Sequence, residues 1–489
     1  MAFSEHHLTS PTPARPDGWP RITESSPVCD LSPGILDYER CAALHNELLA
    51  RAVKGRGREM PSRPLTWWEA RAPSDEIANT LHPSLIEFLK RAWDEDVLPR
   101  HPFSTLFLYI GALKYPDALR DRVSMYEDED EDEDGRFIKL YESSHFRLHD
   151  DEGILFDQTT LKASFIEDYN DSPIITSHKW GWMPLEAILD SYLQMIDEEK
   201  VQIISEDQVK LVKSNSSCHV VDQWIIHHYT ETDLERATTA FKRLVEVIGS
   251  RIPQKTNSTL IQLPWHDPAT LSNQDILPPS SFAYKFLKAI SNCKVQFRYI
   301  APGVRFPTVP EFRDQQPITD FITSPYNHHG QYPGDCPLRI FQVDNAEQQP
   351  VAYDQGFGLR NITAGFYIRP VMQGWPHFWT NGCRLLLPFS IGGSGWARQS
   401  NGEPFGVTDY LNKEPKFCGS HGDLYQSGIT NGITNGHLVQ IDKVLNNWAE
   451  RVEMGDWGVD EHGVAGGIDK FREADTEAHW QKYWIPPSW

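Results

Sequence analysis

The stretch QWIIHHYTETDLERATTAFKRLVEVI, residues 223–248, decides the fold class that the sequence predicts. Its first seven residues are mostly apolar or aromatic and are typical of a strand. Thr232 and Glu235 stand three residues apart, the spacing of a capping box, and predict the start of a helix with apolar residues at helical spacing. The stretch is therefore interpreted as a strand that leads directly into an amphipathic helix.

The same alternation continues along the chain. LIQLPW (260–265) predicts a short apolar strand, FAYKFLKAIS (282–291) a helix, and KVQFRYI (294–300) a third strand. Strands that alternate with helices indicate right-handed crossovers and a parallel sheet. The predicted fold class is α/β, a doubly wound, mainly parallel sheet with a Rossmann-like βαβαβ core over residues 221–305 and an additional α+β C-terminal portion.

Composition divides the rest of the chain. Residues 1–33, rich in Pro, Ser and Thr, predict a disordered arm. Residues 34–220 predict a region of helices and a hairpin, which contains the acidic run EDEDEDED (127–134) as a solvated loop. Residues 306–489 are rich in Gly and aromatic residues and predict short strands and terminal helices. One of these helices, within HLVQIDKVLNNWAERVEMG (437–455), is expected to stop at Gly455.

Net charge and cysteine content indicate which binding partners and which cell compartment to expect. The 489 residues carry a formal net charge of −22, and the chain remains acidic without its acidic run. Such a charge disfavours broad adhesion to nucleic acid or anionic membranes, although a local basic patch is compatible with it. The 7 Cys form no C-x-x-C pair, and no apolar stretch is long enough for a membrane span or a secretion signal. We expect a cytoplasmic protein with reduced thiols.

The segment FIKLYESSHFRLHDDEGILFD (137–157) places polar residues at the tip of a predicted hairpin. Alternating residues are followed by three consecutive acids and then by a second apolar run. The acids form either a binding site or a solvated turn. The residues singled out are His149, Asp150, Asp151 and Glu152.

Further candidates follow from the predicted parallel sheet. In such sheets, ligands bind beyond the carboxyl ends of the strands. A histidine beside an acid can support proton transfer there, although a histidine at a strand end is more often a structural residue. The residues at the three predicted strand ends are His228, Tyr229, Trp265, His266, Asp267 and Arg298.

Two weaker patterns concern phosphate and metal. In FSIGGSGWARQSNG (389–402), the N–H groups of a Gly-rich turn and Arg398 are suited to phosphate, although a bulged strand end needs the same glycines. The His-x-Asp spacing of non-heme iron sites occurs twice, in HDD (149–151) and HGD (421–423), and two histidines are adjacent at 328–329. No third ligand can be identified, so we predict neither a metal nor another cofactor.

Two basic clusters stand out from the acidic background. One lies in RAVKGRGREMPSR (51–63) and the other on the helix predicted after Thr232. Clustered Arg and Lys are suited to a phosphate backbone, but they also occur on solvated loops and helix faces. The candidates for contact with nucleic acid are Arg56, Arg58, Lys242 and Arg243.

Three segments carry a resemblance to a known family: RLLLPFSIGGSGWARQSNG (384–402), GDLYQSG (422–428) and MGDWGVDEHGVAGGIDKFREADTEAHW (454–480). With them, most of the chain after about residue 180 resembles the fungal arginine-containing cyclodipeptide synthases, enzymes of natural-product gene clusters. The resemblance implies a class I synthetase-like core and two aminoacyl-tRNA substrates, one of them arginyl-tRNA, with no metal and no ATP. The family's acidic motif, two aspartates and a glutamate three residues after the second, has no literal copy here; its nearest counterpart is Asp150, Asp151 and Glu152.

The resemblance also implies roles for the candidates. Carboxylates bind a guanidinium group through two hydrogen bonds, so these three acids would select arginine and accept a proton from the attacking amine. The four basic residues would contact tRNA, and His228 and His266, chosen for their place at predicted strand ends, are the candidates to assist catalysis. Two alternatives stay open: a metal-dependent tailoring oxygenase that uses the His-x-Asp pairs, and a non-catalytic binding protein of a natural-product pathway.

Overall fold

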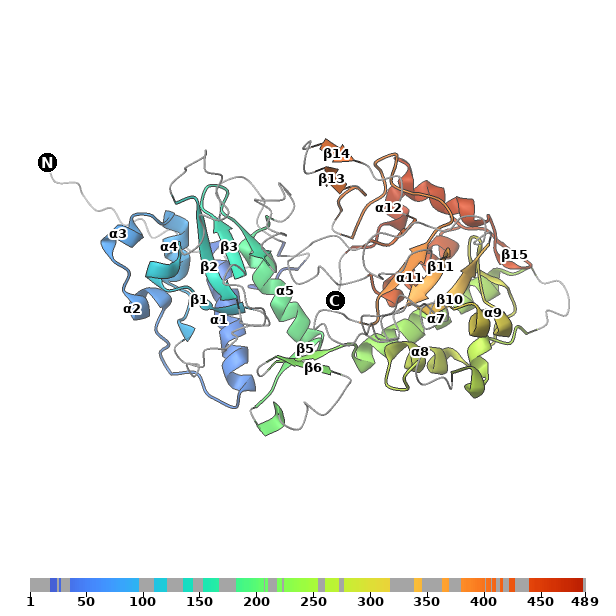
Figure 1. Ribbon diagram of the computed structural model, residues 1–489, viewed down its shortest axis with the longest axis horizontal. Coiled ribbons are helices and arrows are strands. Elements are labelled where there is room, and N and C mark those ends of the chain that lie inside the picture. Colours follow the sequence, from blue (N-terminus) through green and yellow to red (C-terminus); the bar gives the residue numbers. More distant parts are fainter. Residues whose placement is uncertain are drawn as a thin grey trace, which may run out of the picture. The chain divides into compact units, whose positions relative to one another are not determined.

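The computed structural model divides into two compact units, and each is described by itself (Figure 1). The first comprises residues 1–164 and 182–194, and the second comprises residues 165–181 and 195–489. The structure describes residues 18–23, 26–27, 36–95, 110–120, 135–143, 153–166, 182–205, 207–209, 218–221, 224–253, 260–271, 277–316, 338–344, 363–368, 380–400, 402–405, 407–409, 414–416, 422–426 and 439–486. The acidic run at 127–134 and most of the predicted arm at 1–33 lie outside these ranges.

The first unit combines helices with a four-stranded sheet in the order β1-β2-β3-β4, in which β2 pairs antiparallel with both β1 and β3. The predicted hairpin is confirmed, because Phe137 pairs with Asp157 and Glu142 with Gly153. In the apolar segment TLFLYIGAL (105–113), the described residues 110–113 form strand β1. The elements that lie wholly or mostly in this unit are α1 (Tyr38–Gly55), α2 (Trp67–Arg71), α3 (Asp75–Ala78), α4 (Pro83–Leu89), β1 (Ile110–Leu113), η2 (Pro116–Ala118), β2 (Phe137–Ser143), β3 (Gly153–Asp157), β4 (Lys162–Ile166) and α5 (Leu185–Asp197).

In helix α1, local sequence determines where the helix begins and which face is buried. The Asp37 carboxylate accepts a hydrogen bond from the N–H of Arg40 and so caps the first turn. Leu44 and Leu48, four residues apart, lie on the buried face of the helix. The buried guanidinium of Arg40 donates to the carbonyls of Pro20 and Pro27, which fixes the described residues of the N-terminal segment on this helix.

The second unit is built on a seven-stranded sheet with the order β12-β11-β10-β9-β8-β16-β15. Of its six neighbouring pairs, β16 and β8 are parallel and the other five are antiparallel. Two smaller antiparallel sheets have the orders β5-β7-β6 and β13-β14. The strands are β5 (Val201–Ile203), β6 (Cys218–Val221), β7 (Trp224–His227), β8 (Tyr299–Ala301), β9 (Val304–Arg305), β10 (Leu338–Val343), β11 (Gly365–Ile368), β12 (Cys383–Leu386), β13 (Val407–Asp409), β14 (Glu414–Lys416), β15 (Val459–Asp460) and β16 (Gly463–Val464).

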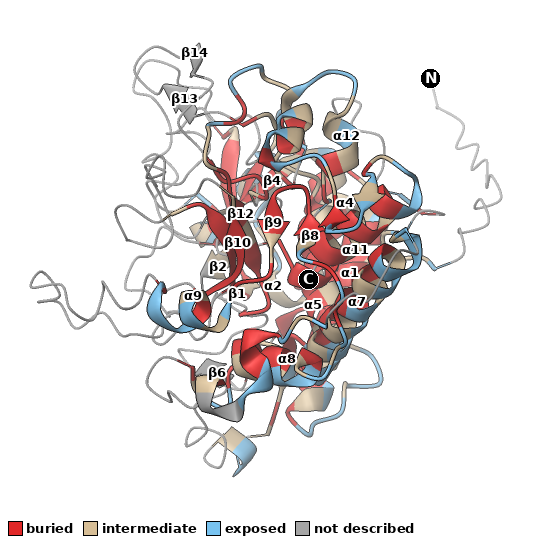
Figure 2. Cartoon of the chain, turned by 90° about the vertical axis from the view of Figure 1, so that its right-hand side faces the viewer, coloured by how far each residue is buried: buried red, intermediate tan, exposed pale blue. Residues whose placement is uncertain are grey.

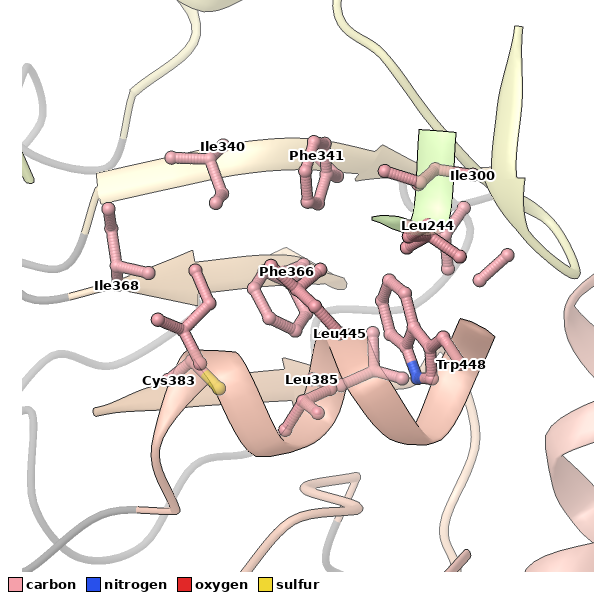
Figure 3. Packing of buried hydrophobic residues seen from close by; sticks show 14 of the residues in the cluster. Leu244, Ile300, Ile340, Phe341, Phe366, Ile368, Cys383, Leu385, Leu445 and Trp448 are labelled. Carbon is pink, nitrogen blue, oxygen red and sulfur yellow. The ribbon is translucent and has the colours of Figure 1, made fainter. Parts of the chain in front are cut away.

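Helices α7 and α11 bury their apolar faces against the side chains of this sheet. Leu244 of α7 and Leu445 and Trp448 of α11 meet residues of β10, β11 and β12 in one buried cluster (Figure 3). The opposite faces of α7 and α8 carry exposed residues, as expected for amphipathic helices (Figure 2). The helices are α7 (Glu231–Arg251), η6 (Pro264–His266), η7 (Pro268–Leu271), α8 (Phe282–Ile290), α9 (Val309–Asp314), α11 (Ile441–Glu453), η11 (Ile468–Asp475) and α12 (Trp480–Tyr483).

The predicted doubly wound parallel sheet is wrong. The first of its three strands, β7, pairs antiparallel with β5 and β6 in a separate sheet. The second, 260–265, makes a single bridge at Ile261 and then a 3₁₀ turn that begins at Pro264, which has no N–H for a strand ladder. In the third, only Tyr299 and Ile300 belong to a strand, and that strand continues to Ala301. Apolar and polar residues alternate in KVQFRYI because Val295 and Phe297 are buried on one side of the segment. Such burial does not require a partner strand.

Several local predictions are confirmed and one is shifted. Helix α11 ends as expected, with Gly455 in the left-handed conformation at φ +77°. The capping box of α7 is formed by Thr230 and Asp233, two residues before the predicted pair, because Thr230 is the last extended residue before the helix. The short strands predicted after residue 306 are present as β10, β11 and β12.

Candidate functional site

The acidic candidates fall in the segment of the chain between β2 and β3. His149, Asp150, Asp151 and Glu152 lie outside the described residues, between the end of β2 and the start of β3. Their proposed role therefore stays a prediction.

The residues predicted at the first strand end are held by structural contacts. The carbonyl of His228 accepts hydrogen bonds from the N–H (2.8 Å) and hydroxyl (3.3 Å) of Thr380. The hydroxyl of Tyr229 donates to the carbonyl of Ser280 at 2.5 Å, and its ring packs edge-on against Phe282. These contacts tie the end of β7 to the start of β12 and to the start of α8.

The residues predicted at the second and third strand ends do not lie at the edge of a parallel sheet. Trp265 is 1% exposed and packs among Phe306, Phe312 and Phe341. His266 and Asp267 are exposed, and Nδ1 of His266 lies 3.1 Å from the carbonyl oxygen of Ser291. Arg298 is exposed with its guanidinium 5.6 Å from the ring centre of Tyr299.

The four candidates for contact with nucleic acid differ in their exposure and in the contacts that they already make within the protein. Arg56, at the C-terminal end of α1, is 7% exposed, whereas Arg58 is exposed. Lys242 is also exposed. Arg243 donates to both carboxylate oxygens of Glu453, at 3.3 and 2.8 Å, and to Asn446 at 2.8 Å, so it joins α7 to α11. Arg58 and Lys242 are therefore the better placed to contact phosphate.

Within the part of the chain that the structure describes, no three His, Cys, Asp or Glu side chains gather around a position suited to a metal ion. Asp423, the described member of the HGD pattern, accepts a hydrogen bond from Arg384 at 3.0 Å. The other candidate ligands, His149, Asp151, His328, His329 and His421, lie outside the described residues, as does His145, four residues before the HDD pattern.

A group of ionisable side chains that the sequence did not single out converges at the start of α7. Lys200, which directly precedes β5, donates a hydrogen bond from Nζ to Oδ2 of Asp233 at 2.6 Å, and both side chains are at most 2% exposed. The same oxygen accepts the N–H of Thr230 at 2.7 Å. Burial lowers the pKa of Lys200, and the carboxylate of Asp233 opposes that shift.

Asp442, in the first turn of α11, belongs to the same group. The residue is 5% exposed, and its ion pair among the described residues is with Lys443 at 3.7 Å. Burial raises the pKa of Asp442, and the nearby charge of Asp233 also raises it, while Lys443, Arg236 and Lys200 act in the opposite direction. Asp442 is therefore a buried acid whose environment favours the proton-bound form or a bound cation.

Backbone contacts bring the start of β12 to this group. The carbonyl of Asn381 accepts the N–H of Ile441 at 3.0 Å, and Gly382 forms a bridge with Gln440. Oδ1 of Asn381 is buried and has no hydrogen-bond partner among the described atoms. A buried acceptor without a donor is costly, and it is the feature expected where a donor from a ligand binds.

The two helices run side by side with their N-termini together. Asp233 and Asp442 interact electrostatically at one end, while Arg251 near the end of α7 donates to the carbonyl of Glu453 at the end of α11. The N-terminal ends of both helix dipoles favour negative charge. We call Lys200, Asp233, Asp442 and Asn381 the helix-start cluster. The first three bring one cation and two carboxylates together in a buried setting, and Asn381 is tied to the start of α11 through its backbone carbonyl.

The first unit contains a second buried group around His45. Nδ1 of His45 accepts from the hydroxyl of Tyr141 and Nε2 donates to the carbonyl of Trp93, both at 2.9 Å, which fixes the neutral ring. Burial lowers the pKa of His45 to about 4. Glu95 accepts the N–H of Leu113 through one oxygen, while its other oxygen has no partner among the described atoms, and burial raises its pKa to about 8.

Sequence patterns could have found part of the helix-start cluster. The Thr230–Asp233 spacing is itself a capping-box signal, and Asp442 falls in the first turn of a helix that the apolar pattern predicts. Lys200 and Asn381 carry no such signal, because their proximity depends on how β5 and β12 are placed.

Among the described residues, no helix combines the length and the apolar composition that a membrane span requires. Comparison of the chain with models of protein families, with curated proteins and with solved structures found no match.

Proposed function

We propose that the protein is a cytoplasmic aminoacyltransferase that makes an arginine-containing cyclic dipeptide from two aminoacyl-tRNAs, and that the helix-start cluster is part of its active site. The segments that carry the family resemblance, 384–402, 422–428 and 454–480, support this proposal. All three belong to the second compact unit, as do Lys200, Asp233, Asn381 and Asp442. The doubly wound sheet implied by the resemblance is no part of the proposal, because the described strands pair mainly antiparallel.

The observation that carries the proposal is the burial of Asp442 at 5% exposure with its closest described cation 3.7 Å away. Asp233 is already paired with Lys200 at 2.6 Å, whereas no cation of the described residues lies as close to Asp442. A buried carboxylate is stabilised by a hydrogen-bonded cation, and a guanidinium group supplies two parallel N–H donors. The arginyl side chain or the α-amine of the substrate fits this requirement. The role in arginine recognition that the resemblance implies for Asp150, Asp151 and Glu152 stays a separate proposal.

The reaction needs no separate energy source, because the ester bond to tRNA is already activated. The α-amine of one aminoacyl group attacks the ester carbonyl carbon of the other. A C–N bond forms, and the C–O bond between the attacked carbonyl and the ribose of its tRNA breaks, which releases that tRNA. The amine loses a proton, and the ribose oxygen that leaves gains one. A second attack of the same kind closes the six-membered ring and releases the second tRNA. An acid with a raised pKa, such as Asp442, is suited to hold the transferred proton.

The experiment that tests the function is expression of the full chain in a heterologous host, with mass spectrometry of metabolites. Incubation of the purified protein with arginyl-tRNA and a mixture of aminoacyl-tRNAs follows. We expect a cyclic product that contains arginine. Its absence from both systems, with folded protein present, would overturn the proposed function.

Two substitutions locate the site. Asp442→Asn removes the charge with little change in size, and we expect product formation to fall by about 100-fold or more. Glu231→Gln is the matched control, because Glu231 also lies in the first turn of a helix but its side chain is 72% exposed. Equal yields from both variants would remove Asp442 from the site, and loss of product from Asp150→Asn, Asp151→Asn or Glu152→Gln would place the arginyl contact at the hairpin.

A further inference from the structure

The loop from Gly392 to Ala397 binds a carboxylate of the protein itself. Asp475, the last residue of η11, accepts four hydrogen bonds from backbone N–H groups of this loop. Oδ2 accepts from Gly392 at 3.0 Å and from Ser394 at 2.8 Å. Oδ1 accepts from Trp396 at 2.9 Å and from Ala397 at 3.0 Å. Each carboxylate oxygen is thus held by two N–H groups.

The backbone conformation of the loop is specific for this arrangement. Gly392 and Gly395 have φ values of +96° and +77°, in the left-handed region, and the N–H of Gly395 closes a turn onto the carbonyl of Gly392 at 3.0 Å. Turns that mix left-handed and ordinary residues direct successive N–H groups to one side and form concave anion sites. A Cβ at Gly392 would lie 2.6 Å from Cβ of Phe405, so a glycine is required there.

Arg398 directly follows the loop, and its charge interacts electrostatically with Asp475. Arg398 is partly buried; the loss of hydration lowers its pKa and the charge of Asp475 raises it. The guanidinium group is fixed by hydrogen bonds to the carbonyls of Gly395 at 2.6 Å and Ala397 at 3.3 Å, and it lies 4.9 Å from the ring centre of Trp480. Four N–H donors and one oriented cation are the elements of an oxyanion site.

We propose that the loop from Gly392 to Ala397 is an oxyanion-binding site whose resident ligand is the side chain of Asp475, and that a free carboxylate or phosphate group occupies it when this side chain is removed. The proposal does not depend on the function proposed above. The N–H donors belong to the loop, whereas the carboxylate that they bind belongs to Asp475 of η11, so the donors remain when Asp475 is replaced. An added anion that binds these donors should therefore restore the stability that the substitution removes.

The test is the thermal stability of Asp475→Ala in the presence of added anions. Loss of four hydrogen bonds to a charged group should lower Tm by about 5 °C or more. Formate should restore much of that loss in a saturable manner, with inorganic phosphate as a second probe and chloride at equal ionic strength as the reference. Rescue by formate alone identifies a carboxylate site, and rescue by phosphate as well identifies a broader oxyanion site.

Two controls make the result decisive. The wild-type protein, whose site is filled, and Asp469→Ala, which removes an exposed acid of the same helix that pairs with Arg472, should show no saturable effect. Equal anion effects in all three proteins, or no effect of formate on Asp475→Ala, would overturn the proposal. Should Asp475→Ala fail to fold in chloride, its refolding yield is compared with and without formate, and an unchanged yield would equally overturn the proposal.

Discussion

Nζ of Lys200 and Oδ2 of Asp233 lie 2.6 Å apart, and neither side chain has more than 2% of its surface exposed. Lys200 precedes a strand of the small antiparallel sheet, and Asp233 caps the long helix α7. The carbonyl of Lys200 also accepts the N–H of His227 at 2.9 Å. Lys200 therefore connects the small antiparallel sheet, through its backbone, to the start of α7, through its side chain.

Removal of one partner of this pair should be costly. Lys200→Met leaves the carboxylate of Asp233 buried without its cation, so we expect the free energy of unfolding to fall by about 3 kcal/mol or more. The matched control is Lys285→Met, because Lys285 pairs with Glu231 of the same helix at 2.7 Å but in an exposed position, where about 0–1 kcal/mol is expected. Chemical denaturation measures both variants, and equal losses would contradict a special role for burial.

The pH dependence of stability in the first unit follows from Glu95 and His45. The folded pKa of Glu95 is raised to about 8, so the folded state holds the extra proton above the unfolded value of 4.5, and stability falls as pH rises from 4.5 to about 8. The folded pKa of His45 is lowered to about 4, so stability rises with pH from about 4 to 6.5. The two effects cancel between about pH 4.5 and 6.5 and leave a decline of about 2 kcal/mol from 6.5 to 8.

This pattern is measured by denaturation at a series of pH values, with the wild type and Glu95→Gln compared at each. The substitution should abolish the decline above pH 6.5 and leave the rise due to His45. Parallel curves for the two proteins across this range would show that Glu95 does not titrate there.

Two neighbouring glycines test the geometry of the oxyanion loop. Gly392→Ala forces a left-handed residue with a side chain and brings its Cβ to within 2.6 Å of Phe405, so we expect a loss of more than about 2 kcal/mol in the free energy of unfolding. Gly393→Ala meets no atom within 4 Å, and a change within about 0.5 kcal/mol is expected. A similar loss in both variants, measured by urea denaturation, would show that the loop does not require this conformation.

Two adjacent basic residues of α7 separate tRNA contact from helix packing. Lys242 is exposed, so Lys242→Ala should leave stability unchanged and, where it contacts phosphate, should reduce the slope of log affinity for arginyl-tRNA against log salt by about 1. Arg243→Ala removes the contacts with Glu453 and Asn446 and should lower stability by about 1 kcal/mol while leaving that slope unchanged. Filter binding over a salt series measures the slope for each variant, and thermal denaturation measures its stability. A reduced slope for Arg243→Ala with an unchanged slope for Lys242→Ala would place the tRNA contact at Arg243.

The sequence by itself determined the local elements. The spacing of apolar residues placed α7, α8 and α11, and Gly455 marked the end of α11, because these features depend on residues within one or two turns. The alternation around the acidic segment likewise gave the pairing of β2 with β3, since a hairpin joins neighbours in the chain.

Only the tertiary structure decided which strands pair and which polar groups meet. The order along the chain around β7 resembles that of a parallel α/β core, yet β7 pairs with β5 and β6, and β8 pairs with β9 and β16. Periodicity records which face of a segment is buried, whereas the choice of partner depends on the packing of distant segments. For the same reason Lys200, Asp233 and Asp442, more than 200 residues apart at their extremes, form a cluster that no local pattern contains.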